Sequence, residues 1–298
     1  MNKEALFDRL KKDFEKRISF LEDKPEETID SSLKALWFAA CGSPKSAEEV
    51  AKLPLPEISD IQLDKLNQLL SLRSNNVPLA HITGRQSFMG LTFLSDKRAL
   101  IPRKETEILG KKACELAQLM SGNGRKLTII DVCCGSGNLG ISIACLVPNV
   151  SVYATDLSAE AVELTKENIA FLNQTHNVQA IEGDVLSAFL NDNFFEKTDL
   201  IVCNPPYISS AKVQKMNVEI ASNEPTLAFD GGMFGTKIIQ KLIQDAHKLL
   251  KDDGWLAFEV GLGQGEFVMQ LCKKTALYKV VESMTDASGN IRVIYTQK

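Results

Sequence analysis

The chain has 298 residues, of which 44% are hydrophobic and 24% charged, and it carries a formal net charge of −4. This length and composition are typical of a globular protein with one large domain or two modest ones. The acidic balance argues against a protein that binds mainly by neutralising phosphates. No apolar run approaches the roughly 18–20 residues of a membrane span.

The N-terminus and the cysteines narrow the class further. The charged start, MNKEALFDRLKKDFEKR, lacks the apolar core and cleavage site of a signal peptide, so we expect a cytoplasmic protein. The seven cysteines form no CxxC pair and only three histidines accompany them. We therefore expect no metal site, and most of the thiols are typical of small buried residues in a reducing compartment.

The first 80 residues have a helical pattern. Leu6, Leu10, Phe14 and Ile18 recur at helical spacing, and DIQLDKLNQLLSLR resumes the pattern after the two prolines of KLPLPEIS. We interpret residues 1–80 as a small helical domain. Composition alone does not distinguish an oligomer contact, a lid and a partner-recognition domain.

Residues 81–102, HITGRQSFMGLTFLSDKRALIP, have a different character. Their apolar residues lie among Gly84, Gly90 and Ser95, which predicts a β-hairpin that links two parts of the chain.

From residue 103 to residue 298, strands and helices alternate. The expected strands are KLTIIDV, SVYATD, VQAIEGD, DLIVCN, WLAFEV, YKVVES and IRVIYTQ. Such alternation predicts an α/β domain with a mostly parallel seven-stranded sheet and helices on both faces. The last two strands are joined by MTDASGN without a helix, so they form a hairpin and one of them is antiparallel.

The segment IIDVCCGSGNLG places Gly135, Gly137 and Gly140 directly after the first of these strands, and Asp156 ends the next strand. This spacing fits a dinucleotide-binding turn, and it fits an S-adenosylmethionine site. Both sites use glycine for close backbone approach and an acid to hold ribose hydroxyls.

Two further acids favour S-adenosylmethionine. Asp131 lies on the strand just before the turn, where its charge suits a cationic ammonium and sulfonium and repels a pyrophosphate. Asp184 ends the third strand, where it can receive an adenine amino group. A nicotinamide oxidoreductase is disfavoured because no acid suited to hydride transfer lies near the turn.

The fourth strand ends in the sequence NPPY. Asn204 precedes a proline and is therefore held in an extended conformation, while Pro205 and Pro206 fix two successive φ angles. The result is a stiff corner at the carboxyl end of a strand, where α/β sheets bind their ligands.

The NPPY corner is suited to methylation of a planar NH2 group, which is a poor nucleophile because its lone pair is delocalised. The Asn204 side-chain oxygen and the Pro205 carbonyl can each accept one N–H, which aims the nitrogen and stabilises its growing positive charge. Tyr207 can stack on the planar group and face the cationic centre. No general base is needed, because the proton becomes acidic once the methyl group arrives.

Several segments together resemble a known family. NPPY, PLAHITGRQSFMGLTF, LIPRKETEIL, DVCCGSG and NEPTLAFDGG are similar to segments of the PrmC/HemK family. These protein-(glutamine-N5) methyltransferases modify the glutamine of the GGQ motif in peptide-chain release factors and so modulate translation termination. The resemblance covers nearly the whole chain and is weakest in the first 75 residues.

The resemblance implies a fold, a cofactor, a partner and a set of site residues. The fold is the class I S-adenosylmethionine-dependent methyltransferase fold, Rossmann-like, with an N-terminal helical domain that helps to recognise the release factor. S-adenosylmethionine is the methyl donor and S-adenosylhomocysteine the product. Neither membrane association nor stable nucleic-acid binding is expected. The methionine part of the donor would be lined by Cys133, Cys134, Gly135, Ser136 and Gly137.

The remaining site residues also follow from the resemblance. Asp156 would hold the ribose, and Asp184 and Val185 would flank the adenine. Phe88 and Arg103 lie in segments that the family places near the cofactor and the site entrance. The substrate glutamine would be held by Asn204, Pro205, Pro206 and Tyr207.

The chain departs from the family pattern at a few positions. The family usually has glycine where Cys133 stands, and threonine or a small residue where Cys134 stands. A Cβ and a sulfur must therefore fit where backbone approach matters, which weakens the expected cofactor binding. Lys104 stands where proline is usual.

Two other functions remain open. NPPY is also found in methyltransferases that act on adenine N6 or guanine N2 of nucleic acids. That activity needs a basic surface and a base-flipping pocket, which the acidic balance disfavours. The second alternative, motivated by Cys133 and Cys134, is a protein that binds the cofactor but no longer catalyses.

Overall fold

The computed structural model of the protein describes residues 2–213, 217–232 and 235–298. The chain divides into two compact units. The first unit comprises Met1–Lys97, Ile101–Lys104 and Asn217–Glu224. The second comprises Arg98–Leu100, Glu105–Met216 and Pro225–Lys298.

The first unit is built mainly from short helices that start at well-formed caps. Thr28, Ser46 and Ser59 each form a capping box, in which side chains satisfy backbone N–H groups at the helix start. The fully buried Trp37 packs against Phe7 in the core of this unit. The helices are α1 (Lys3–Glu15), α2 (Ile29–Ala40), α3 (Ala47–Val50), α4 (Asp60–Ser74) and α5 (Leu79–Thr83).

A β-hairpin follows these helices within the same unit. Gly84 ends α5 in the left-handed conformation, with φ of 67°. Strands β1 (Arg85–Phe88) and β2 (Leu91–Leu94) then pair antiparallel. The predicted hairpin is therefore present and is shorter than the segment 81–102, because α5 occupies its start.

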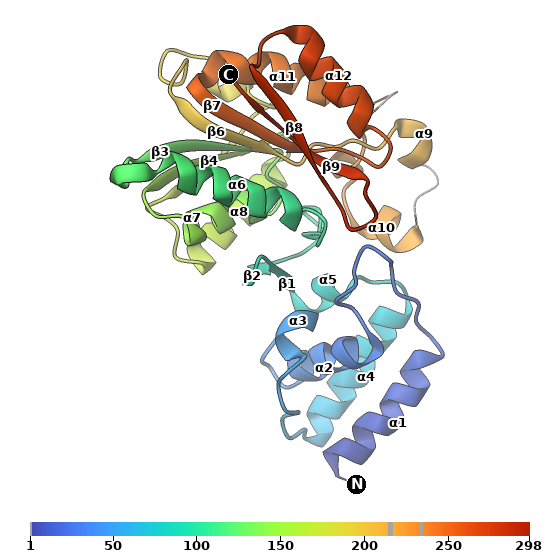
Figure 1. Ribbon diagram of the computed structural model, residues 1–298. Coiled ribbons are helices and arrows are strands. Elements are labelled where there is room, and N and C mark those ends of the chain that lie inside the picture. The colour runs from blue at the N-terminus through green and yellow to red at the C-terminus, as the bar shows by residue number, and fades with distance from the viewer. Residues whose placement is uncertain (1, 214–216, 233–234) are drawn as a thin grey trace. The chain divides into compact units, whose positions relative to one another are not determined.

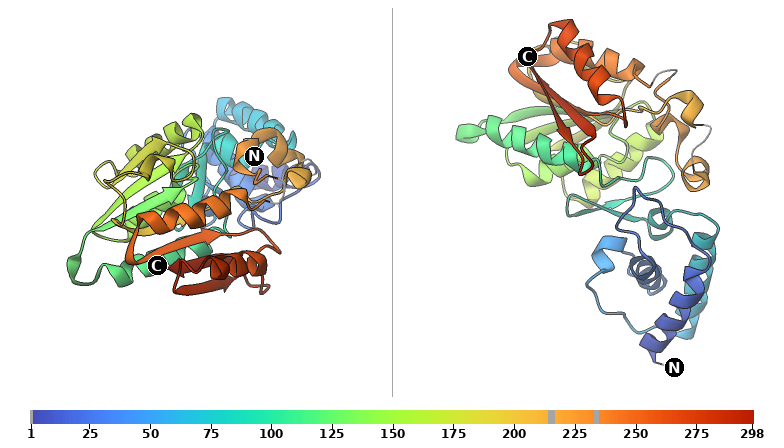
Figure 2. Two further views of the ribbon diagram at one scale, coloured as in Figure 1. Left: turned by 90° about the horizontal axis from the view of Figure 1, so that it is seen from above. Right: turned by 45° about the vertical axis from the view of Figure 1, so that its right-hand side comes forward.

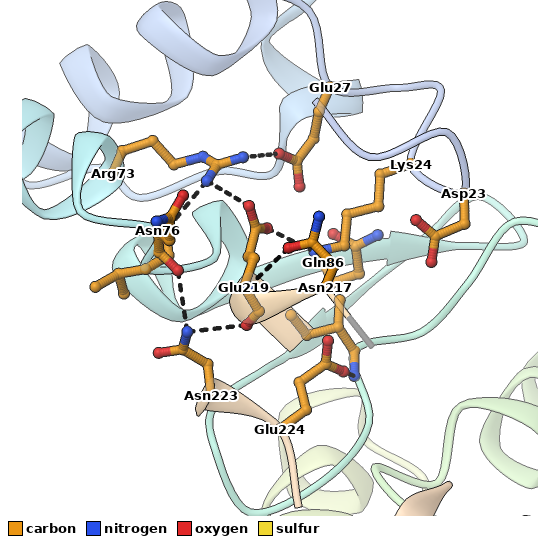
Figure 3. A network of polar contacts seen from close by, with 12 residues as sticks. Asp23, Lys24, Glu27, Arg73, Asn76, Gln86, Asn217, Glu219, Asn223 and Glu224 are labelled. Carbon is orange, nitrogen blue, oxygen red and sulfur yellow. Dashed lines mark hydrogen bonds and ion pairs between the residues drawn. The ribbon is translucent and has the colours of Figure 1, made fainter. Parts of the chain in front are cut away.

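The first unit also contains a helix from a distant part of the chain, α10 (Val218–Asn223). Its Glu219 carboxylate accepts hydrogen bonds from Lys24 at 3.1 Å and from Arg73 at 2.8 Å, as Figure 3 shows. Arg73 also pairs with Glu27 at 3.1 Å, and all four side chains are almost fully buried. This charge network holds α10 against the N-terminal helices.

The second unit contains the predicted α/β sheet. Its strands lie in the order β5-β4-β3-β6-β7-β9-β8, and β9 alone runs antiparallel to its neighbours. The mostly parallel seven-stranded sheet with one antiparallel strand is thus confirmed. The strands are β3 (Leu127–Val132), β4 (Val150–Asp156), β5 (Val178–Glu182), β6 (Thr198–Cys203), β7 (Leu250–Glu259), β8 (Val280–Thr285) and β9 (Ile291–Gln297).

Helices cover both faces of this sheet, as Figures 1 and 2 show. One face packs against α6 (Glu107–Met120), α7 (Asn138–Leu146) and α8 (Ala159–Phe171). The other packs against α11 (Lys237–Leu249) and α12 (Gly265–Thr275), which share a core cluster with inward-facing residues of β3 and β6. The short helix α9 (Ser210–Val213) follows β6. Among the described residues, no helix has the length and apolar character needed to cross a membrane.

Candidate active site

The two motifs singled out in the sequence begin at neighbouring strand ends. After β3 the chain adds β4 and then β5 on one side of β3, and it then returns to add β6 on the other side. The strand order therefore reverses between β3 and β6. Val132 and Cys203 are register partners at the ends of these strands. The glycine turn after Val132 and the NPPY corner after Cys203 therefore meet at a topological switch point, where open α/β sheets bind their ligands.

The following strand, through its backbone, and the following helix, through its side chains, hold the backbone of the glycine turn. The Cys134 N–H donates to the Thr155 carbonyl at 3.0 Å. Thr165 donates its hydroxyl to the Gly135 carbonyl at 2.9 Å, and Asn168 donates its amide to the Ser136 carbonyl at 3.0 Å. These bonds fix the conformation of the turn.

The turn uses left-handed backbone conformations. Gly135 and Gly137 have φ of 56° and 79°, which suit glycine, and Gly137 also caps α7. A Cβ added at Gly135 would meet only the Ala99 Cβ, at 3.9 Å. One side of this backbone is thus open for the close approach that the sequence predicts.

Asp156 supports the turn and has capacity for further hydrogen bonds. Its Oδ2 accepts the Gly135 N–H and its Oδ1 accepts the Ser158 N–H, both at 2.9 Å. Burial raises the pKa of this carboxyl, and the backbone hydrogen bonds oppose that rise. A carboxylate offers about four acceptor positions, so Asp156 keeps capacity for a ribose hydroxyl beside its backbone donors.

Asp131 lies deeper than the sequence suggests. It is fully buried, its Oδ2 accepts the Gly140 N–H at 2.8 Å, and its Oδ1 has no partner among the described residues. Burial raises its pKa to about 7. A cationic group near the turn would favour the charged form, so this carboxyl fits a donor that carries an ammonium and a sulfonium.

Asp184 and Val185 line a cavity of about 710 Å³ together with Leu227 and Gly231 from the NEPTLAFDGG segment. Val185 is buried with φ of 55°, which is strained for a β-branched side chain and typical of ligand sites. Asp184 is exposed and forms an ion pair with Lys241 at 2.6 Å. The predicted adenine contact is therefore also a partner of this lysine.

The Asn204 side chain is held by a residue that sequence reasoning missed. Its Nδ2 donates to the Thr106 hydroxyl oxygen at 3.1 Å. Because the amide nitrogen faces Thr106, the amide oxygen points the other way and is available as an acceptor. The Pro205 carbonyl accepts no backbone hydrogen bond from the described residues. Both predicted acceptors are therefore present at the corner.

Tyr207 is anchored by a second missed residue, Glu259, at the end of β7. The Tyr207 hydroxyl donates to Glu259 Oε1 at 2.9 Å, and Arg292 lies 3.3 Å from the same oxygen. Burial and the Glu259 charge raise the pKa of Tyr207. The one available signal in the sequence was an acid that ends the apolar strand WLAFE, which the structure pairs with the NPPY strand.

The NEPTLAFDGG segment braces the NPPY corner by its backbone. Ile208 N–H donates to the Phe229 carbonyl at 2.9 Å, and Gly231 N–H donates to the Ile208 carbonyl at 2.8 Å. A Cβ on Gly231 would come within 2.6 Å of the Pro206 carbonyl oxygen. Glycine is therefore required here, which explains why this segment accompanies NPPY.

Phe88 and Arg103 lie in the first unit. Phe88 is fully buried and packs edge-on against Phe93 in the hairpin. Arg103 pairs with Glu224 at 2.7 Å and with Asp23 at 3.2 Å. Their placement near the cofactor stays a prediction from the resemblance.

No cluster of three metal-binding side chains occurs in the described part of the chain.

The cysteines of the turn are accommodated in different ways. Cys134 is buried, with its sulfur 3.5 Å from the Thr165 hydroxyl. Cys133 has φ of 55° and packs its side chain against the core that contains Cys203. The sulfur of Cys133 is thus accommodated by that core.

We expect Cys133→Val to lower the free energy of unfolding of the second unit, because a β-branched residue at positive φ costs about 1–3 kcal/mol. Cys133→Gly should be tolerated, since glycine adopts this φ without strain. Urea unfolding of both variants beside the parent tests this. Equal stability of the valine and glycine variants would show that the left-handed conformation is not imposed on this position.

The sequence of this chain is similar to those of known methyltransferases. The family described as methyltransferase small domain matches residues 113–233. The release factor glutamine methyltransferase of Thermodesulfovibrio yellowstonii is 33% identical over 82% of this chain and 84% of its own length. The protein of the same name from Clostridium botulinum is 34% identical over 81% of this chain and 83% of its own.

Solved structures show similarity of fold. A methyltransferase from Pyrococcus furiosus superimposes with a TM-score of 0.50 over 71% of this chain and 91% of its own, at 18% identity. The hMettl16 catalytic domain superimposes with a TM-score of 0.54 over 76% of this chain and 81% of its own, at 14% identity.

Proposed function

The chain belongs to the family of release factor glutamine methyltransferases, and from this premise we propose that it methylates a release-factor glutamine. The methyl group of S-adenosylmethionine would be transferred to the side-chain amide nitrogen of the glutamine in the GGQ motif. This membership confirms the predicted resemblance. Together with the sheet order, it also confirms the class I methyltransferase fold.

One observation on this chain's own residues supports the proposal most directly. The Asn204 carboxamide donates its NH2 group to Thr106, which leaves Oδ1 as an acceptor at the switch point beside the glycine turn. An acceptor in that place suits a substrate NH2 group. It does not suit a carboxylate or a phosphate, which have no hydrogens to donate.

The corner acts on the substrate amide by geometry and charge. Asn204 Oδ1 and the Pro205 carbonyl would accept the two hydrogens of the glutamine NH2 and so fix the direction of its nitrogen lone pair. As positive charge grows on that nitrogen, both oxygens stabilise it more strongly. The excess proton leaves afterwards to water, because the methylated nitrogen is briefly cationic and acidic.

The residues around the turn fit the methyl donor. S-adenosylmethionine supplies a methyl group on a positively charged sulfur. Asp156 keeps acceptor capacity for a hydroxyl, Gly135 has an open backbone face, and Asp131 has a buried oxygen without a partner among the described residues. We assign the ribose to Asp156 and the adenine to the cavity beside Val185.

The helical unit would recognise the release factor. This role extends the predicted domain division, in which residues 1–80 form a recognition domain, 81–102 a linking hairpin and 103–298 the catalytic domain. A release-factor substrate also implies a cytoplasmic location and an effect on translation termination.

The decisive experiment incubates the purified protein with donor labelled in its methyl group and with recombinant release factors, RNA and DNA in separate reactions. Mass spectrometry should locate the added methyl on the GGQ glutamine. Label on adenine N6 or guanine N2 would support the nucleic-acid alternative instead. Normal donor binding by calorimetry without transfer to any acceptor would support a protein that no longer catalyses.

Asp156→Ala should weaken donor binding much more than it slows the reaction at saturating donor. Each hydrogen bond to a charged group contributes about 1.5–3 kcal/mol, so the donor KM should rise by on the order of 10–100-fold. Glu160→Ala, on the exposed side of α8, is the matched control and should change neither constant. An unchanged donor KM in the Asp156 variant would exclude the ribose assignment.

A further inference from the structure

A single buried carboxylate lies behind both ends of the NPPY corner. Glu259 is 1% exposed, and its Oε1 accepts the Tyr207 hydroxyl at 2.9 Å. The Thr106 hydroxyl, also buried, donates a hydrogen bond to the same carboxylate. Because Thr106 in turn contacts Asn204 at 3.1 Å, Glu259 reaches the first and the last residue of the corner.

The Thr106 hydroxyl can determine which end of the Asn204 amide faces it. A hydroxyl has one hydrogen to donate. If that hydrogen goes to the Glu259 carboxylate, the Thr106 oxygen can only accept from Asn204. The Asn204 amide must then present its NH2 to Thr106, as observed, and its oxygen to the opposite side.

Neighbouring charged groups affect whether the Glu259 carboxyl is ionised. Arg292 contacts Glu259 Oε1 at 3.3 Å and lies 3.8 Å from Glu105. Burial raises the pKa of Glu259, while the hydrogen bonds of Thr106 and Tyr207 and the charge of Arg292 lower it. Glu259 Oε2 has no hydrogen-bond partner in the described part of the chain, so the contacts of this carboxylate converge on Oε1.

We propose that Glu259 is a positioning residue that sets the orientation of the Asn204 amide through the Thr106 hydroxyl and holds Tyr207 directly. The inference rests on the proposed function, because it assigns the orientation of the acceptor oxygen to this triad. Neither Thr106 nor Glu259 needs to touch the substrate.

The first test compares Thr106→Val with Thr106→Ser. Valine has the same shape without the hydroxyl, so kcat should fall by about 10-fold, the effect of one hydrogen bond. Serine keeps the hydroxyl and should restore kcat to near the parent value. The donor KM should stay within about twofold in both variants, because neither touches the donor site.

Glu259→Gln should have a larger effect because it reverses the hydrogen-bond direction. A glutamine amide can donate to the Thr106 oxygen, which frees the Thr106 hydrogen to donate to Asn204. The Asn204 amide would then flip and present its NH2 group to the substrate, so the acceptor oxygen would be lost. We expect kcat to fall by on the order of 100-fold with an unchanged donor KM.

The pH profile separates positioning from packing. Protonated Glu259 can donate to Thr106 and disturb the arrangement, so activity should fall on the acid side as this carboxyl takes up its proton. Removal of the Thr106 hydroxyl removes one influence that lowers the pKa of Glu259, so the acid limb should move to higher pH in the valine variant. Arg292, Glu105 and Tyr207 are unchanged, and the serine variant should keep the parental profile.

A measurement without catalysis completes the test. The Asn204 side-chain NH2 signal, assigned by its loss in Asn204→Ala, should exchange with water on the order of 10-fold faster in Thr106→Val than in Thr106→Ser. Identical exchange, kcat and pH profiles in the two variants would overturn the proposal. If the parent does not methylate the glutamine but the exchange rates differ as expected, the proposed function fails while the positioning role stands.

Discussion

Asn204→Ala is expected to lower kcat by on the order of 10²–10³-fold, because one preorganised acceptor for the growing charge is lost. This corresponds to about 2.7–4 kcal/mol of the reaction barrier. The donor dissociation constant should stay close to that of the parent. The Asn204 side chain interacts with Thr106 and, in the proposed assignment, would contact the substrate amide, whereas Asp156 and the glycine turn would hold the donor.

The measurement pairs single-turnover rates with calorimetry of donor binding. Asn193→Ala, in an exposed loop of the same unit, is the matched control and should leave both quantities unchanged. A parental rate in Asn204→Ala would show that the amide oxygen has no part in the reaction. A large loss of donor affinity would instead assign Asn204 to the cofactor site.

Glu219→Ala is expected to destabilise the first unit by about 3–5 kcal/mol, because it leaves buried cations without their partner. Glu219 accepts from both Lys24 and Arg73, which are 2% and 1% exposed. Glu27 alone would then face two buried positive charges. The pKa of the Glu27 carboxyl is already raised by its burial.

Urea unfolding monitored by Trp37 fluorescence measures this effect. A Trp255→Phe background in parent and variants makes Trp37 the reporter of the first unit. Glu57→Ala removes a carboxylate that is 86% exposed in its ion pair with Lys3, and it should change the transition little. Equal unfolding midpoints of the Glu219 and Glu57 variants would contradict a structural role for the buried network.

The proline corner and the mostly parallel sheet with one antiparallel strand were accessible from sequence for local reasons. Pro205 and Pro206 restrict their own φ angles and that of Asn204 whatever the rest of the chain does. The alternation of apolar strands and helices likewise predicts a parallel sheet, and the short MTDASGN connection requires one antiparallel strand. The carboxyl ends of parallel strands share one edge, so the glycine turn and NPPY could be expected to meet.

Other parts of the site depend on contacts between residues far apart in the chain. Thr106 lies 98 positions from its partner Asn204, and Glu259 lies 52 positions from its partner Tyr207. No local sequence pattern links the members of either pair. Asp131 was expected as a charge at the turn, but the fold buries it fully against α7 and raises its pKa to about 7. The burial of Asp131 results from the packing of helices on the sheet, so the sequence of its own strand does not predict it.

The sequence by itself therefore determined the types of element, the stiff corner and the chemical groups at the strand ends, because backbone restriction and periodicity act over a few residues. Only the tertiary structure decided that the Asn204 amide nitrogen is taken up by Thr106 while its oxygen is left free, and which carboxylate lies behind Thr106 and Tyr207. It also decided that α10 completes the N-terminal unit through Glu219. Hydrogen-bond direction and charge burial depend on neighbours that come together only when distant segments pack.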